Sequence, residues 1–136
     1  MQNTEITKSR AEELLRFPPN FSVPNRKFVK EWIGGKTEGE VLTFPFPEYE
    51  EDVLEFFHLA SQEWWTDYQY DPEEASRILQ DDRAIETADL KTLKTLLTYC
   101  VRRERFGEGC WGHFLDTGKI QKLLIRLQQL VPMLPS

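Results

Sequence analysis

The sequence predicts a mainly α-helical fold, arranged as a single compact domain of five to six helices. Apolar residues recur at three- and four-residue steps through the last third of the chain, which is the spacing of amphipathic helices. Helix start signals also recur in the middle third. A chain of 136 residues with 40% hydrophobic content can bury one core but is short for two. We therefore expect residues 1–136 to form one domain, whose most regular part spans 88–127.

The segment 88–127 predicts a C-terminal hairpin of two antiparallel helices. Asp89 can cap the first helix by accepting hydrogen bonds from its free backbone amides. The apolar face of this helix comprises Leu90, Leu93, Leu96, Leu97, Cys100 and Val101. The apolar face of the second helix comprises Ile120, Leu123, Leu124, Leu127, Leu130 and Val131. Between them, residues 108–115 predict a short helix that carries Trp111 and Phe114 toward the core.

The N-terminal half is less regular. Ser9 and Glu12 have the spacing of a capping box, and the apolar residues after them predict a short helix. Pro18 and Pro19 are expected to end that helix. The segment 28–46 suits either a helical turn or a small β-hairpin, and the sequence leaves both open.

Two more helices have start signals in the acidic middle of the chain. The acidic run 48–52 precedes apolar residues that continue to Ala60, as expected for a helix with negative charge in its first turn. Asp71 followed by Pro72 predicts a capped helix that runs to about Gln80.

Acidic and basic residues are unevenly distributed around the net charge of −6. Residues 1–35 carry six basic and four acidic groups, residues 36–89 carry three and sixteen, and residues 90–136 carry eight and three. Opposite signs favour packing of the basic C-terminal helices beside the acidic middle. The acidic surface disfavours nucleic acid as a partner, so a helix-turn-helix within 114–127 ranks only third among the functional readings. It suits a basic protein partner better.

The sequence indicates a cytoplasmic protein that does not enter a membrane. No apolar run approaches the roughly 20 residues that span a bilayer, and residues 1–16 lack the apolar core of a secretory signal. The chain has two cysteines, Cys100 and Cys110, which cannot form the disulfide framework of a secreted module. We expect both thiols to be reduced.

The arginines near residue 103 are the strongest candidates for a ligand site. Arg102 and Arg105 are three residues apart on one helix face, so their guanidinium groups could converge on a phosphate or carboxylate. Glu108 and His113 complete this candidate anion-binding set. The competing interpretation is structural: the arginines pair with the acidic middle segment or complement the negative end of their helix.

An aromatic cluster is the second candidate, as an interaction surface. It comprises Trp64, Trp65, Tyr68 and Tyr70. Trp64 and Tyr68 share a helix face, which favours core packing, but Trp and Tyr beside charged residues are also typical of protein interfaces.

Two further kinds of chemistry have weak support. Cys100, Cys110, His113 and His58 do not provide the paired spacings of a structural zinc site, so we expect no metal and no cofactor. A low thiol pKa at Cys110, beside His113, would suit a nucleophile, but a lone Cys is usually a small core residue. No catalytic residues are assigned.

The C-terminal third also resembles a known family. The segments ADLKTLKTLLTYCVRRERFGEGCW and GKIQKLLIRL resemble an uncharacterised family of small bacterial proteins, known only as a domain of unknown function. The resemblance implies that RRERFGEGCW is the family signature. Relatives often carry His in place of Cys110, which argues against a required thiol.

These observations favour a non-enzymatic role over an enzymatic one. We expect a small cytoplasmic binding or regulatory module that recognises another protein through an acidic and aromatic surface. The alternative is an anion-binding or catalytic site built around the RRERF segment.

Overall fold

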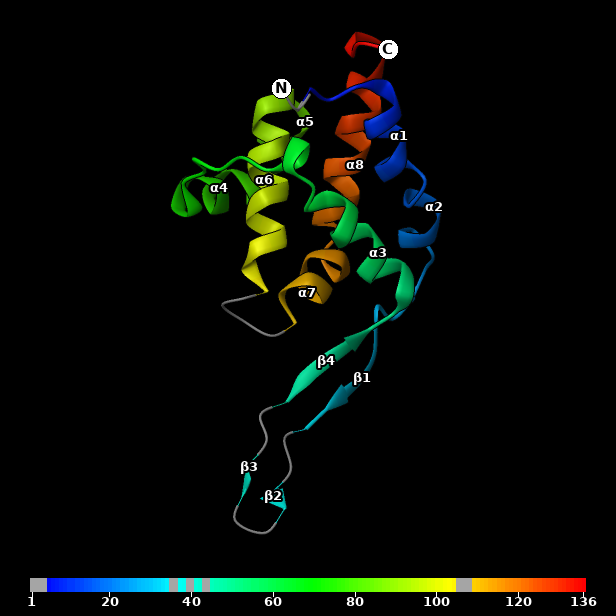
Figure 1. Cartoon of the computed structure of the whole chain (residues 1–136), viewed down its shortest axis with the longest axis vertical. Helices are drawn as coiled ribbons and strands as arrows, with labels where there is room; N and C mark the ends of the chain where they lie inside the picture. The colour runs from blue at the N-terminus through cyan, green and yellow to red at the C-terminus, as the bar shows by residue number, and fades with distance from the viewer. Residues whose placement is uncertain (1–4, 35–36, 39–40, 43–44, 105–108) are drawn as a thin grey trace.

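Helices form most of the chain, and a narrow β-ribbon extends from them (Figure 1). The computed structural model describes residues 5–34, 37–38, 41–42, 45–104 and 109–136. The α-helices are α1 (Lys8–Leu15), α2 (Pro18–Phe21), α3 (Glu51–Ala60), α4 (Pro72–Leu79), α5 (Asp82–Glu86), α6 (Leu90–Arg103), α7 (Cys110–Asp116) and α8 (Lys119–Leu130). The 3₁₀ turns are η1 (Glu63–Trp65) and η2 (Val131–Met133). The strands are β1 (Val29–Ile33), β2 (Thr37–Glu38), β3 (Val41–Leu42) and β4 (Phe46–Tyr49).

The C-terminal helices confirm the predicted hairpin. The Asp89 carboxylate caps α6 by accepting a 2.8 Å hydrogen bond from the amide of Thr92. The short helix α7 turns the chain, and Gly118, in the left-handed conformation at φ 77°, leads into α8. α6 and α8 then pack against each other.

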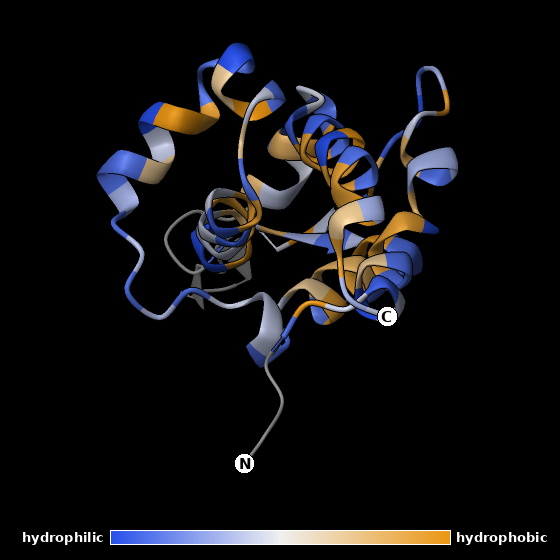
Figure 2. Ribbon diagram, turned by 90° about the horizontal axis from the view of Figure 1, so that it is seen from above, coloured by the Kyte–Doolittle hydropathy of each residue, from blue (hydrophilic) through white to orange (hydrophobic). Residues whose placement is uncertain are grey.

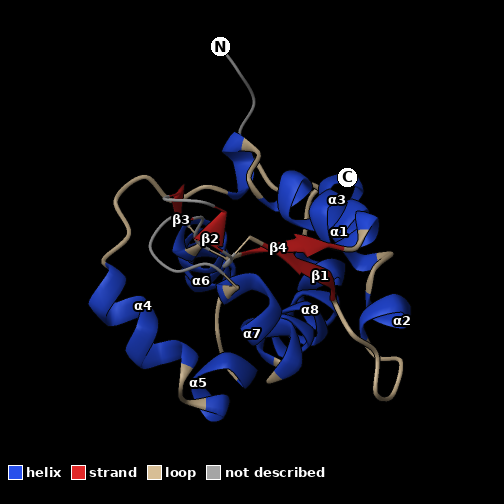
Figure 3. Ribbon diagram, turned by 90° about the horizontal axis from the view of Figure 1, so that it is seen from below, coloured by secondary structure: helices blue, strands red, loops and turns tan. Residues whose placement is uncertain are grey.

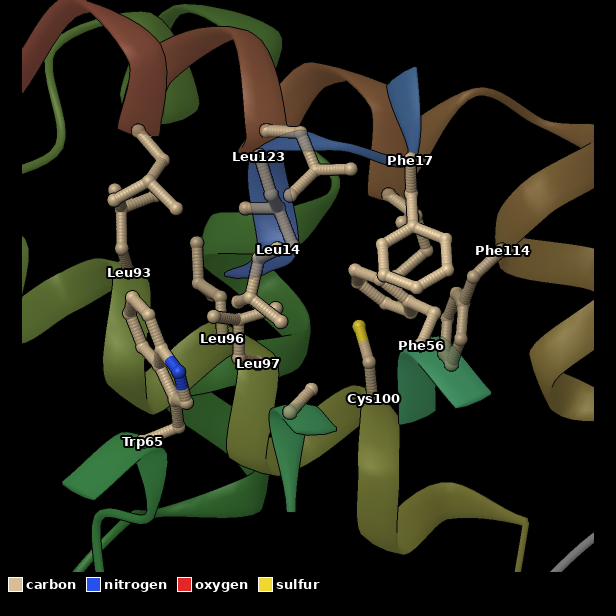
Figure 4. Packing of buried hydrophobic residues seen from close by; sticks show 14 of the residues in the cluster. Leu14, Phe17, Phe56, Trp65, Leu93, Leu96, Leu97, Cys100, Phe114 and Leu123 are labelled. Atoms are coloured by element: carbon tan, nitrogen blue, oxygen red, sulfur yellow. The ribbon is translucent and has the colours of Figure 1, made fainter. Parts of the chain in front are cut away.

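The core lies where α1, α3, α6, α7 and α8 converge (Figure 4). Hydrophilic and hydrophobic residues alternate along the helices (Figure 2), so each helix can turn its apolar side inward. Fully buried members from different helices include Leu14, Phe56, Leu96, Leu115 and Leu123.

The start of the chain differs from the prediction in two details. The cap of α1 is Thr7, not Ser9: the Thr7 hydroxyl accepts a 3.2 Å hydrogen bond from the amide of Arg10. Thr7 has the extended backbone that a cap requires, whereas Ser9 already lies inside the helix. Pro18 and Pro19 also begin the short helix α2, because proline fits the first helical turn, where no amide donor is needed.

The alternative left open for residues 28–46 is settled in favour of β structure. β1 pairs with β4 in antiparallel register, with Ile33 opposite Phe46 and Trp32 opposite Pro47. The β1–β4 ribbon starts beside α7 and extends away from the helices (Figures 1 and 3). β2 and β3 pair in the same way farther along it.

The base of the β1–β4 ribbon is fixed to α3. The amide of Glu50 donates to the carbonyl of Phe28 at 3.0 Å. Arg26 forms a two-point ion pair with Asp52 of α3, and this pair holds the pKa of the Asp52 carboxyl below its usual value.

The acidic middle segment contains α5, a helix that the sequence analysis did not anticipate. Asp81 caps α5 by accepting hydrogen bonds from the amides of Arg83 and Ala84. Asp82 then forms ion pairs with Lys119 at 3.0 Å and with Lys122 at 2.8 Å. The basic C-terminal helices therefore do pack beside the acidic middle, through lysines of α8.

Candidate functional site

The carboxylate of Glu104, within the RRERF segment, is a structural cap. It accepts hydrogen bonds of 3.0 Å from the backbone amides of Gly109 and Trp111, at the first turn of α7. A carboxylate at this position satisfies amide donors and complements the positive end of the helix. Glu104 therefore connects the end of α6 to the start of α7.

Aromatic rings pack around this cap. Trp111 stacks on Phe57 of α3 with ring centroids 4.3 Å apart, and its indole N–H donates to the carbonyls of Cys100 and Val101. The hydroxyl of Tyr49 lies between the Glu104 carboxylate and the amide of Gly112, which donates to it at 3.3 Å. Burial raises the pKa of the Tyr49 phenol, and the charge of Glu104 adds to this effect.

Arg102 and His113, the two described members of the predicted anion-binding set, do not converge on one site. The guanidinium of Arg102 lies over the rings of Tyr70 and Tyr68, 5.1 and 5.9 Å from their centroids. His113 lies on α7, in a groove that Arg102 does not border. Arg105 and Glu108 lie outside the described residues. The described part of the set is therefore divided, and Arg102 is engaged with two aromatic rings.

The predicted aromatic surface is also divided. Trp65 is only 1% exposed and lies in the core, so it is not available to a partner. Trp64 is half-buried, with the Arg10 guanidinium 4.1 Å from its ring centroid. Tyr68 remains 71% exposed.

A groove borders the end of α6, and we call it the Arg103 groove. It encloses 310 Å³. Its lining residues are Ser76, Leu79, Gln80, Tyr99, Arg103, Cys110, His113, Phe114, Thr117 and Lys119. It brings His113 together with Arg103, a residue that the predicted anion-binding set did not include.

Neither cysteine has the character of a nucleophile. Cys100 and Cys110 are free thiols, and burial raises the pKa of both. The hypothesis of a low thiol pKa at Cys110 is therefore wrong, because desolvation outweighs the opposing effect of Arg103. No group of three or more His, Cys, Asp or Glu side chains among the described residues is arranged to hold a metal ion.

The β1–β4 ribbon has two different faces. Val29, Trp32 and Tyr49 approach α7, where Trp32 lies against Gly109 and Val29 against Gly112. A bulge between Val29 and Glu31 allows both Val29 and Trp32 to face this way.

The opposite face, which we call the outer face, consists of Glu31, Ile33, Phe46 and Glu48. Ile33 and Phe46 are directly opposite each other and are 39% and 46% exposed. Glu31 and Glu48 form the next pair, and neither carboxylate has a hydrogen bond or ion pair with another described residue. Like charges in direct cross-strand positions destabilise a sheet. The outer face therefore combines an exposed apolar pair with a pair of carboxylates that no described residue neutralises.

Sequence reasoning missed the outer face because it depends on register. Ile33 and Phe46 are separated by a segment whose pairing the sequence did not determine. The alternation of Glu31, Trp32 and Ile33 was the available signal. Once this segment is assumed to be a strand, Glu31 and Ile33 lie on one face and Trp32 lies on the other.

The fold defines a small, mainly helical protein with a projecting β-ribbon. The chain belongs to the DUF6508 family, described as a family of unknown function, whose sequence profile matches residues 6–133. The predicted membership of an uncharacterised family is thus confirmed. No curated protein and no solved structure matches the chain significantly. Among the described residues, no helix has both the length and the hydropathy needed to cross a bilayer.

Proposed function

We propose that this protein is a non-enzymatic binding module that recognises another protein through the outer face of its β1–β4 ribbon. The observation that carries the proposal is the position of the exposed Ile33–Phe46 pair next to the carboxylates of Glu31 and Glu48, which pair with no other described residue. This arrangement is an acidic and aromatic surface, although it lies on the ribbon and not at residues 64–70.

The chemistry of the outer face specifies the partner. An apolar side chain of the partner would cover Ile33 and Phe46, and a Lys or Arg would relieve the repulsion between Glu31 and Glu48. A basic partner would also be steered toward a chain of net charge −6. We place this interaction in the cytoplasm, where the free thiols of Cys100 and Cys110 stay reduced.

The substitution Glu48→Lys should change stability and partner binding in opposite directions. It places an opposite charge across from Glu31, so we expect the free energy of unfolding to rise by about 0.2–1 kcal/mol. Binding should weaken at the same time, because the partner's cation then meets a like charge. A structural role alone would not produce a variant that is more stable and binds less.

Site-specific photo-crosslinking in the native cells tests the proposal. A photoreactive residue at position 33 should give a discrete adduct with a partner, and Glu48→Lys should abolish it. Position 125 on α8 is the matched control, because Ile125 is also apolar and is 58% exposed. Equal adducts from positions 33 and 125, or an adduct that persists with Glu48→Lys, would overturn the proposal.

A further inference from the structure

The Arg103 groove differs from the rest of the surface in its charge. Arg103, His113 and Lys119 line it, and none of the lining residues that the structure describes is an Asp or Glu. This is unexpected in a chain with 23 acidic and 17 basic residues. The groove therefore concentrates positive potential in an otherwise acidic protein.

Among the described residues, Arg103 is a cation of this groove that has no carboxylate partner. Its guanidinium forms no ion pair with any carboxylate of the described residues. Lys119 contributes less, because Asp82 accepts a hydrogen bond from its ammonium group at 3.0 Å. The side chain of Arg103 can thus offer its planar set of donors to an anion from outside.

The inner part of the groove is apolar. Leu79 comes from α4, and the rings of Tyr99 and Phe114 lie with centroids 6.1 Å apart. Sites for small organic molecules typically combine apolar walls with a few polar groups that fix orientation. Among the lining hydroxyls, Ser76 accepts a hydrogen bond from Gln80 and keeps its own proton for a ligand, whereas Thr117 already donates to the carbonyl of His113.

We propose that the Arg103 groove binds a small organic anion, a phosphate monoester or carboxylate with an apolar ring as its body. The acidic headgroup pairs with Arg103 and His113, and the ring packs against Leu79, Tyr99 and Phe114. The volume of 310 Å³ limits the ligand to a compact molecule. The proposed binding is non-covalent, and the lining thiol of Cys110, whose pKa is raised by burial, is not assigned a chemical role.

Four small molecules test separately whether the groove requires the apolar ring and the acidic headgroup. Phenyl phosphate and phenylacetate carry both a ring and an acidic headgroup, benzyl alcohol carries only the ring, and inorganic phosphate carries only the charge. At fixed ionic strength, we expect at least one of the first two to bind with a Kd of about 1 mM or tighter. In NMR spectra, the saturable shifts should be centred on Tyr99, His113 and Phe114.

Arg103→Gln and Arg102→Gln are matched variants. They remove the same charge from adjacent residues, but only Arg103 borders the groove, while Arg102 lies over Tyr68 and Tyr70. We expect Arg103→Gln to weaken binding of the preferred probe about tenfold, as for a lost charge-assisted hydrogen bond, and Arg102→Gln to leave it unchanged. Lys119→Gln and Lys122→Gln form a second pair, because both lysines contact Asp82 but only Lys119 borders the groove.

Three results would overturn the proposal. The first is the absence of saturable binding by both ring-bearing anions up to 10 mM, on the order of ten times the expected Kd. The second is equal binding of benzyl alcohol or of inorganic phosphate, because a site for an organic anion requires both parts. The third is an equal loss of affinity in Arg102→Gln and Arg103→Gln, which would indicate only nonspecific attraction to positive charge.

Discussion

The hydroxyl of Tyr49 donates a hydrogen bond to the carboxylate of Glu104, at 2.9 Å from Oε1 and 3.0 Å from Oε2. This contact joins β4 to the end of α6, between residues far apart in sequence. Because the same carboxylate caps α7, one side chain fixes the position of the ribbon relative to both helices. Glu104 thus sets the geometry between the outer face and the Arg103 groove without belonging to either.

Replacing Glu104 with Gln should destabilise the protein by about 2–4 kcal/mol. The amide has only one acceptor oxygen, so at least one of the donors from Tyr49, Gly109 and Trp111 loses its partner in a partly buried place. Urea denaturation measures the change. Glu86→Gln is the control, since Glu86 is exposed and has no partner among the described residues, and it should shift stability by less than about 0.5 kcal/mol. Equal changes in the free energy of unfolding would show that the Glu104 cap stabilises the protein no more than an exposed carboxylate does.

The buried phenol of Tyr49 predicts a loss of stability at high pH. Its pKa is raised above the ordinary value of 10.0 in the folded state, chiefly by burial, so ionisation favours the unfolded chain. This contribution is complete below pH 10 and is lost as the pH rises toward the folded-state pKa. The slope should approach about 1.4 kcal/mol per pH unit.

Tyr49→Phe isolates this effect from the other tyrosines. Unfolding free energies measured from pH 9 to 11.5 should fall more steeply in the wild type than in Tyr49→Phe, which cannot ionise at this position. Parallel curves for the two proteins would mean that the phenol ionises as easily in the folded state as in the unfolded one.

Local signals in the sequence were enough to predict much of the helical fold. Asp89 and Asp71 were identified as caps because capping depends on the next few residues, and both accept the expected amide hydrogen bonds. α5 was missed because five residues are too few to show a periodic pattern, although Asp81 caps it in the same way.

The candidate sites were less predictable because they depend on contacts between distant segments. Helical spacing put Arg102 on a helix face with Arg105, but only packing shows that Tyr68 and Tyr70 lie beneath Arg102. In the same way, Arg103 and His113 border one groove because α7 folds back beside α6. Sequence spacing carries no information about such pairings.

Leu97→Ala tests the predicted phase of the central helix hairpin. Leu97 is 2% exposed within the core, so its truncation should cost about 2–5 kcal/mol through lost burial and a residual cavity. Ile125→Ala on α8 is the matched control, because that side chain is 58% exposed and should cost less than about 1 kcal/mol. Thermal unfolding of both variants gives the comparison, and similar melting temperatures would contradict the assigned core.

The final prediction concerns the contact between Trp32 and Gly109. Gly109 and Gly118 precede α7 and α8 with positive φ angles of 91° and 77°, a conformation that disfavours any residue with a Cβ. Alanine at either position should therefore cost about 1–2 kcal/mol. At Gly109 the new Cβ would also lie 2.8 Å from Cη2 of Trp32, whereas at Gly118 no atom of the described residues lies within 4 Å of a new Cβ. Only Gly109→Ala should displace the Trp32 indole.

The displacement can be measured separately from stability. The indole N–H resonance of Trp32 should shift in Gly109→Ala and stay in place in Gly118→Ala. The half-exposed indole can rotate away, so the steric contribution at Gly109 is expected to stay below about 1 kcal/mol. In a Trp32→Ala background, Gly109→Ala and Gly118→Ala should have the same cost, because only the backbone penalty remains. A Trp32 resonance that does not respond to Gly109→Ala would show that the ribbon does not rest on the start of α7.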